Sequence, residues 1–180
     1  ELPEVDDEFV QDVSDKETLE EYKEELRETV AKRLQDEADK DVDEQISEKL
    51  MELVQGEIPE AMYENQTKDM LRDFETRLRS QGLNMETYMQ YMGMDINALK
   101  GMYREDAEKR VKLRLALETI AKKENVEVTE DEIEEEYTKM AEAYKMKVER
   151  VKAAVPVESL TEDLKVQKAL EIVKESAVIQ

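Results

Sequence analysis

The sequence has 180 residues, of which 42% are charged, and its formal net charge at pH 7 is -21. This negative field repels phosphate backbones and anionic lipid head groups, so neither a nucleic acid nor a membrane surface is expected as a partner. The chain contains no Cys and no His, which excludes disulfides, the usual zinc ligands and the usual nucleophilic pairs of enzymes. We therefore expect no cofactor, no metal and no catalytic residue.

The residue types favour helices. Only four Gly and three Pro occur, and long segments consist of Ala, Glu, Lys, Leu and Arg. No stretch reaches 18 consecutive apolar residues, and no basic segment precedes a short apolar one, so neither a membrane span nor a signal peptide is expected. The absence of Cys is compatible with a reducing compartment. The first residue is Glu1 and not Met, which indicates a piece of a longer protein.

The first predicted helix is unusually long. The residues before Thr18 are expected to form a connector. Thr18 and Glu21 then form a T-x-x-E capping box, and no Gly or Pro interrupts the chain until Gly56. The sequence therefore predicts a spine helix over residues 18–56.

Apolar or small residues recur at every fourth position of this helix. Because an α-helix turns about 100° per residue, each step of four overshoots a full turn by about 40°, and the stripe rotates around the helix. A left-handed coiled coil requires a repeat of about 3.5 residues, so a simple zipper is not expected. Different neighbours must cover the two ends of the helix. The stripe consists of Tyr22, Leu26, Val30, Leu34, Ala38, Val42, Ile46 and Leu50.

Three further helices are predicted up to Asn125. Pro59 suits the first turn of one, and Gly82 lies just past its end. A short helix follows over residues 84–92. Asp95 is a good N-cap for a longer helix that ends near Asn125.

Two more helices are predicted in the remaining sequence. Thr129 with Glu132, and Ser159 with Glu162, form capping boxes, and Pro156 separates the two helices. Helical hairpins with short connections pack antiparallel. We therefore expect an all-α protein, elongated and non-compact, with a long spine helix and two helical-hairpin arms. Its expected parts are a connector (1–17), the spine helix (18–56), a first arm (57–125) and a second arm (126–180).

Two acidic runs superficially resemble functional sites. The D-x-D-x-D segment at 39–43 opens like a calcium loop, but Glu44 stands where that loop requires Gly, and Leu50 stands where it requires Glu. We interpret it as a solvated helix face. The acidic run at 130–136 lies at a helix start, where the helix dipole favours negative charge, so we interpret it as capping and not as a catalytic carboxylate pair.

The stretch from Met85 to Tyr103 holds five of the ten Met and three of the seven Tyr. Flexible thioether side chains can repack against many apolar partners, and Tyr adds amphipathic contact. Two interpretations stay open: an adaptable binding surface, or a small core that caps a helical hairpin. The candidate substrate-binding residues are Met85, Tyr88, Met89, Tyr91, Met92, Met94, Met102, Tyr103, Met140, Tyr144 and Met146.

Taken in order, several short segments resemble the C-terminal domain of the trigger factor family of ribosome-associated bacterial chaperones. The similarity covers essentially the whole chain. The matching residues are Leu2-Pro3-Glu4, the charged helix after Thr18, Ile58-Pro59-Glu60, Gln81-Gly82-Leu83 with Tyr88, Ala107 with Val111, Ile120-Ala121, Val126 with Val128-Thr129-Glu130, Ala141 with Tyr144, and Leu164 with Lys168-Ala169.

The resemblance implies a cytoplasmic, ATP-independent holdase domain that binds unfolded or nascent polypeptides through exposed apolar patches in a cradle between two helical arms. The family's ribosome-docking domain and its peptidyl-prolyl isomerase domain have no counterpart in these residues. Ribosome contact is therefore expected only through the missing N-terminal domain, and no isomerase activity is expected. The alternative is a helical scaffold or dimerisation module without client binding, and a weak homodimer is compatible with the long charged helices.

Overall fold

The computed structural model describes residues 5–178, and within this range it contains eight helices and no strand. The expectation of an all-α protein is confirmed. The matching residues Leu2-Pro3-Glu4 lie outside the described range. The chain divides into two compact units, whose described parts are residues 5–45 and 46–178.

The predicted connector contains a helix. Helix α1 (Asp7–Val13) begins after Asp6, whose carboxylate accepts a hydrogen bond of 2.9 Å from the backbone N–H of Phe9. The carboxylate of Asp7 accepts a hydrogen bond of 2.7 Å from the backbone N–H of Leu19. Val10 is fully buried, so this short helix is docked and is more than a linker.

Helix α2 (Leu19–Glu52) confirms the predicted long helix. The hydroxyl of Thr18 accepts a hydrogen bond of 3.3 Å from the backbone N–H of Glu21, as the capping signal indicated. The carboxylate of Glu21 in turn accepts one of 3.3 Å from the N–H of Glu17. Local side-chain chemistry therefore fixes where this helix starts.

The rotating stripe of α2 is mostly uncovered. No residue of the helix is buried, and every residue from 23 to 41 is exposed. The stripe is half-buried at its ends, as at Tyr22 and Leu50, and Leu50 packs against a cluster of α5 and α8. Coverage of the stripe is thus confined to its ends. The exposed stripe residues include Leu26 (44%), Val30 (42%) and Leu34 (55%).

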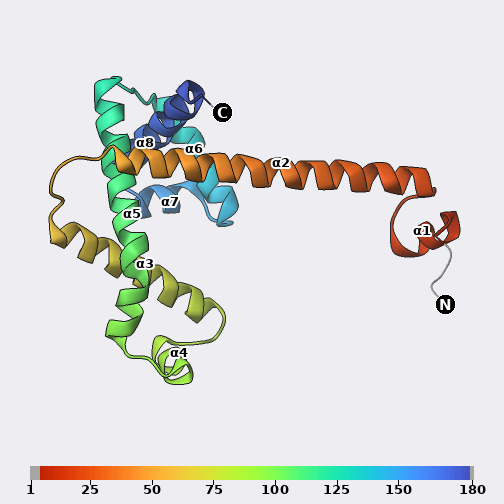
Figure 1. Ribbon diagram of the computed structural model, residues 1–180, viewed down its shortest axis with the longest axis horizontal. Coiled ribbons are helices and arrows are strands. Elements are labelled where there is room, and N and C mark those ends of the chain that lie inside the picture. Colours follow the sequence, from red (N-terminus) through yellow and green to blue (C-terminus); the bar gives the residue numbers. More distant parts are fainter. Residues whose placement is uncertain (1–4, 179–180) are drawn as a thin grey trace. The chain divides into compact units, whose positions relative to one another are not determined.

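In the second unit, α3 (Glu60–Ser80) and α5 (Ile96–Lys123) cross and pack against each other (Figure 1). Each helix buries one apolar face. The only buried polar side chain in the described range is that of Thr67, whose hydroxyl donates a hydrogen bond of 2.9 Å to the carbonyl oxygen of Tyr63. The buried residues of the pair are Thr67, Met70, Leu71, Leu78, Leu99, Ala107, Val111, Leu117 and Ala121.

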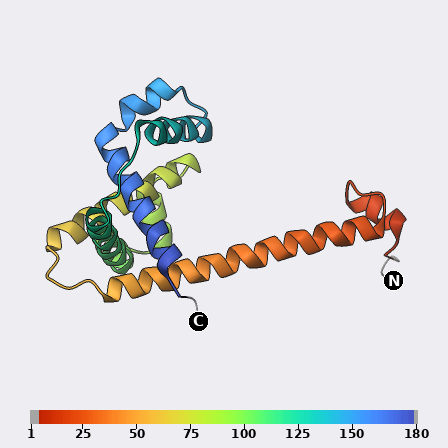
Figure 2. The ribbon, with the colours of Figure 1, turned by 90° about the horizontal axis from the view of Figure 1, so that it is seen from above.

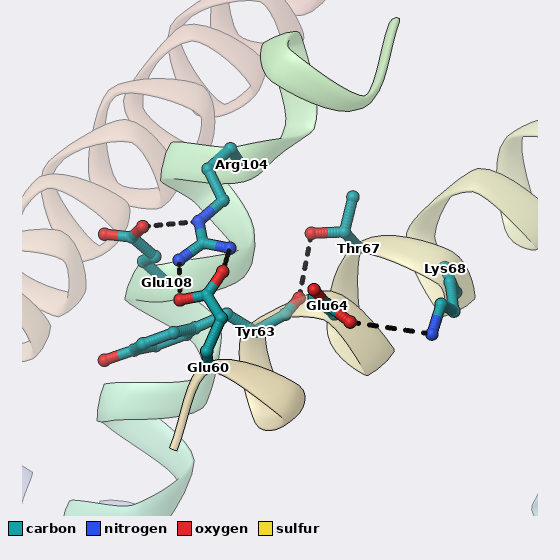
Figure 3. A network of polar contacts seen from close by, with 7 residues as sticks. All are labelled: Glu60, Tyr63, Glu64, Thr67, Lys68, Arg104 and Glu108. Atoms are coloured by element: carbon teal, nitrogen blue, oxygen red, sulfur yellow. Dashed lines mark hydrogen bonds and ion pairs between the residues drawn. The ribbon is translucent and has the colours of Figure 1, made fainter. Parts of the chain in front are cut away.

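A guanidinium holds the start of α3 on α5 (Figure 3). Arg104 donates to both carboxylate oxygens of Glu60, one of them at 2.8 Å, and to Glu108 at 2.5 Å. It also lies 4.9 Å from the ring centre of Tyr63. These hydrogen bonds raise the pKa of Arg104 and lower that of Glu60. A bidentate pair of this kind fixes relative orientation as well as distance.

Helices α6 (Glu130–Ala143) and α7 (Val148–Ala154) lie beside the first half of α8 (Val157–Ser176) (Figure 2). Tyr137 and Val151 belong to their shared apolar cluster, and the Tyr137 hydroxyl donates a hydrogen bond of 2.8 Å to the carbonyl oxygen of Val155. The buried residues of this cluster are Tyr137, Ala141, Val151 and Leu160.

Two details of the sequence reading were wrong here. Helix α7 was not predicted, and α8 begins directly after Pro156 and not at the expected Ser159 cap. Pro156 is the N-cap residue, with φ -61° and ψ 142°, and it makes no side-chain cap hydrogen bond. Its ring fixes φ, so the backbone is already oriented for the helix to begin at Val157. Ser159 therefore lies inside the first turn.

Helix α8 also packs on α5. Ala169 is fully buried against Leu117 and Ala121, and Arg114 of α5 donates a hydrogen bond of 2.9 Å to Asp163. Lys168 donates one of 2.9 Å to the carbonyl oxygen of Glu127, just before α6. Helix α8 thus joins two clusters, one with α6 and α7 and one with α5.

The cap of α6 should titrate abnormally. Lys168 lies 2.6 Å from Glu132, whose carboxylate also accepts the N–H of Thr129 at 2.8 Å, and these contacts lower the pKa of Glu132 to about 2. A lowered pKa favours the folded state above the ordinary Glu value of about 4.3, and this contribution is lost as the pH falls toward 2. Lys168→Met should raise the Glu132 pKa part of the way back, because the Thr129 bonds remain. An NMR titration of the Glu132 side-chain carboxyl measures this pKa in the parent and in the variant.

Lys165→Met provides the control, because Lys165 pairs with Glu162 at 2.9 Å and does not contact the cap. The pKa of Glu132 should not change in this variant. A Glu132 pKa that stays near 2 in Lys168→Met would show that the cap alone lowers it.

Candidate functional site

The methionine-rich stretch forms α4 (Met85–Met92), the turn after it and the first two turns of α5, at the end of the α3/α5 pair (Figure 1), and a second turn precedes α4. Both turns need left-handed backbone, with φ 76° at Gly82 and 65° at Gly93. Glycine adopts these angles without the strain of a Cβ atom. The carboxamide oxygen of Asn84 then caps α4 by accepting the N–H of Thr87 at 2.8 Å.

Two of the predicted binding residues pack against Phe74 of α3, and one of them, Tyr88, attaches α4 to the rest of the unit. The ring of Tyr88 meets Phe74 of α3 edge to face, with ring centres 5.0 Å apart, and Tyr103 of α5 lies 5.9 Å from the same ring. Tyr88 and Tyr103 are half-buried. Their packing is structural, so the interpretation as a small capping core describes this side of α4.

Three other predicted residues are open to solvent. Tyr91 is 89% exposed, Met92 48% and Met102 62%. We call these three residues the α4 surface; the first two belong to α4, and Met102 lies in the second turn of α5. Apolar side chains this exposed contribute little to folding, so none of the three belongs to the core.

The remaining residues of the stretch lie between these extremes. Met85, Met89 and Met94 are half-buried. Met89 and Met94 line a shallow hollow together with Glu86, Gln90, Gly93, Asp95 and Ala98. A hollow with two thioethers on its wall and carboxylates at its edge can take an apolar side chain from a partner.

The predicted residues near the end of α6 form a separate group. Met140 packs against the cluster around Tyr137, so it is partly structural. Tyr144 is 69% exposed and Met146 is 37% exposed. Lys145, between them, has a positive φ of 52° and ends the helix. The structure therefore supports exposure for two of these three residues.

An apolar groove of about 520 Å³ lies where the chain passes from α2 to α3, beside α5. The sequence reading did not identify it. Leu53 is 75% exposed at its edge. The signal that could have found it is a pair of adjacent apolar residues, Leu53 and Val54, shortly before Gly56. The groove is lined by Leu50, Leu53, Val54, Gln55, Gly56, Glu57, Ile58, Leu115, Ala116, Thr119, Ile120 and Lys123.

The acidic residues do not assemble into a site in the part of the chain that the structure describes. There, no group of three or more Asp, Glu, His or Cys is placed to hold a metal ion. The segment at 39–43 lies inside α2, and Asp39 accepts a hydrogen bond of 2.7 Å from the Gln35 amide. None of the described helices is both long and apolar enough to span a bilayer.

The fold and these surfaces define an all-α domain with one long helix, helical hairpins and open apolar patches. The chain belongs to the trigger factor family. Residues 18–175 match the family described as bacterial trigger factor protein (TF) C-terminus. This match confirms the resemblance found in the sequence.

Curated relatives agree over nearly the whole chain. It is 46% identical to trigger factor of Bacillus licheniformis over 178 residues and 45% identical to that of Bacillus subtilis over 178 residues. Each alignment covers 98% of this chain and 42% of the relative. The chain therefore spans about two fifths of the length of these relatives.

A solved structure of trigger factor domains from Thermotoga maritima has the same fold. The TM-score is 0.53 at 20% sequence identity, and the match covers 77% of this chain and 83% of the other. At this level of identity the likeness supports the helical architecture.

Proposed function

We propose that this chain is a chaperone domain that holds unfolded or nascent polypeptides without ATP, by contact with exposed apolar patches between its helical arms. The observation that carries the proposal is the α4 surface, where Tyr91, Met92 and Met102 stay exposed beside a packed aromatic cluster. Membership in the trigger factor family supports the same role.

The residue types of the α4 surface suit weak binding of many sequences. Thioether side chains have three rotatable bonds and a polarisable sulfur, so they adapt to partners of different shape with little strain. Tyr supplies a large contact area with few rotatable bonds. The net charge of -21 opposes self-association of a protein that exposes such patches.

The partners and the location follow from the same proposal. The clients are unfolded or nascent chains in the cytoplasm, and contact with a ribosome is made by a part of the family's chain that lies outside these residues. No nucleic acid, membrane or cofactor takes part. The groove beside Leu53 and the exposed end of α6 at Tyr144 are further client contacts, because both expose apolar side chains.

The alternative of a helical scaffold or weak homodimer is favoured by one observation. Leu26, Val30 and Leu34 of α2 are exposed on a single stripe. A scaffold would use this stripe and leave client aggregation unchanged. The two functions are therefore separated by assays of client holding and of oligomeric state.

The substitution pair Met92→Gln and Met102→Gln is the direct test. Because both side chains are exposed, unfolding free energy should change by less than about 1 kcal/mol. Client holding should weaken at least tenfold, since even one buried Met contact contributes about 1.5–3 kcal/mol and each 1.4 kcal/mol is a factor of ten in affinity. The measurements are a chemical melt and the protein concentration that halves light scattering by an aggregating denatured client.

Met62→Gln is the matched control, because Met62 is an exposed Met (38%) of α3 outside the α4 surface. It should leave client holding unchanged. A stable Met92→Gln, Met102→Gln chain that holds client as well as the parent would remove the α4 surface from the proposal. A parent chain that holds no client but forms dimers would favour the scaffold.

A further inference from the structure

The sulfur chemistry of this chain is confined to methionine. It has ten Met and no Cys, so thioethers are the only sulfur groups that an oxidant can reach. Oxidation to the sulfoxide replaces a flexible apolar group by a polar one, and reductases reverse it. The effect on the protein then depends on where each Met lies.

We propose that Met92 and Met102 are reversible oxidation sites, and that their conversion to sulfoxides switches off the α4 surface as a client-binding site. The loss of client binding on oxidation rests on the proposed function. The assignment of Met92 and Met102 as oxidation sites concerns only the chemistry of these two side chains and does not depend on that function.

The reaction requires a two-electron oxidant such as a peroxide. A sulfur lone pair attacks one peroxide oxygen, the O–O bond breaks, and proton transfer releases water, so a thioether and hydrogen peroxide give a sulfoxide and water. In the reverse direction two thiols reduce the sulfoxide, giving the thioether, a disulfide and water. The thiols come from a thiol-dependent sulfoxide reductase.

The exposure of the methionines sets the order of reaction. Met102 is 62% exposed and Met92 is 48% exposed, whereas Met70, in the core of the same helix pair, is 5% exposed. An oxidant in solution therefore reaches the α4 surface before it reaches the core. Met62, 38% exposed on α3, is an accessible thioether outside the surface.

The fold should survive this oxidation, because none of the interactions that hold α4 depends on an exposed sulfur. The helix is capped by the Asn84 carboxamide and closed by a backbone hydrogen bond of 3.1 Å from Met94 N–H to the Met89 carbonyl oxygen. It is attached through the rings of Tyr88 and Phe74. A sulfoxide at Met92 or Met102 leaves these contacts in place. It weakens client binding, because the polar sulfoxide must lose its bound water when an apolar client side chain packs against it.

The experiment treats the 180-residue chain with limiting hydrogen peroxide and maps sulfoxides by peptide mass spectrometry. Circular dichroism follows the fold, and light scattering by an aggregating denatured client follows holding. We expect sulfoxides at Met92 and Met102 before Met70, an unchanged helical spectrum, and several-fold more protein needed to halve the scattering. Treatment with the two methionine sulfoxide reductases, one for each sulfoxide epimer, and dithiothreitol should restore holding.

The oxidation-inert variant Met92→Leu, Met102→Leu is compared with itself before and after peroxide. Its ratio of treated to untreated holding should stay near one, whereas Met62→Leu should lose holding as the parent does. The proposal is overturned if the parent retains holding with both sites oxidised, if reductase restores nothing, or if Met70 reacts first. If the Met92→Leu, Met102→Leu variant holds no client even before peroxide, the proposal is tested by the parent chain alone, compared before oxidation, after oxidation and after reductase treatment. An untreated parent that holds no client contradicts the proposed function instead, and the peptide map still tests the two sites.

Discussion

Leu99→Ala should lower the free energy of unfolding by about 2–5 kcal/mol, because it leaves a cavity in a well-packed interior. Leu99 is 1% exposed and is one of the two largest fully buried side chains in the described range. It lies one turn into α5, beyond the Asp95 cap, where the helix packs on α3. Urea unfolding of the second unit, followed by circular dichroism, measures the change.

Met102→Ala is the matched control, since Met102 lies three residues further along the same helix and is 62% exposed. An exposed substitution of this kind should change stability by no more than about 0.5 kcal/mol. Equal losses in the two variants would mean that the end of the α3/α5 pair is not packed around Leu99.

Tyr137→Ala should destabilise the α6, α7 and α8 cluster by about 3–5 kcal/mol, as other large aromatic truncations in cores do. Tyr137 is 3% exposed, and its hydroxyl reaches the carbonyl oxygen of Val155 at the end of α7. Its ring lies 5.5 Å from the Lys152 ammonium of the same short helix. Removing the side chain takes away both the core of the cluster and the anchor of α7, and hydrogen exchange across 148–154 should show the release.

Two comparisons isolate the causes. Tyr144→Ala removes the same side chain at a position that is 69% exposed, and it should change stability by no more than about 0.5 kcal/mol. Tyr137→Phe keeps the ring and removes only the hydroxyl, so the loss should be about 0.5–1.5 kcal/mol. If Tyr137→Phe is as damaging as Tyr137→Ala, the hydrogen bond and not the ring secures α7.

Helix boundaries set by local chemistry could be predicted. Asp95 and Thr129 were predicted to be caps, and each accepts a backbone N–H from three residues ahead, at 2.8 and 3.3 Å. Gly82 was predicted to lie just past a helix end, and its φ is positive. These features depend on a few neighbouring residues, so the sequence alone contains the information.

Helix α7 escaped prediction because nothing local distinguishes it. It has seven residues, and Lys147 before it makes no side-chain cap. An isolated helix of this length is unstable in water. It exists because Val151 is buried in the cluster with Tyr137, and this contact spans 14 positions that a local pattern does not connect.

The methionine stretch shows the same division at the candidate site. Its composition indicated adaptable apolar side chains, and this property belongs to the residue type, whether a side chain faces the core or the solvent. Composition did not distinguish Tyr88, which packs on Phe74, from Tyr91, which is 89% exposed three residues later. The use of each side chain as a binding residue stays a prediction.

By itself, the sequence determined the helical class, the helix ends that side chains cap, the acidic field and the family, because these depend on residue type and spacing. The tertiary structure decided the rest. It joined α8 to α5 through Ala169, left the middle of α2 uncovered, and assembled a groove beside Leu53 from segments about 60 residues apart in the sequence. Which apolar side chain is covered depends on neighbours distant in the chain, and burial is a property of that arrangement.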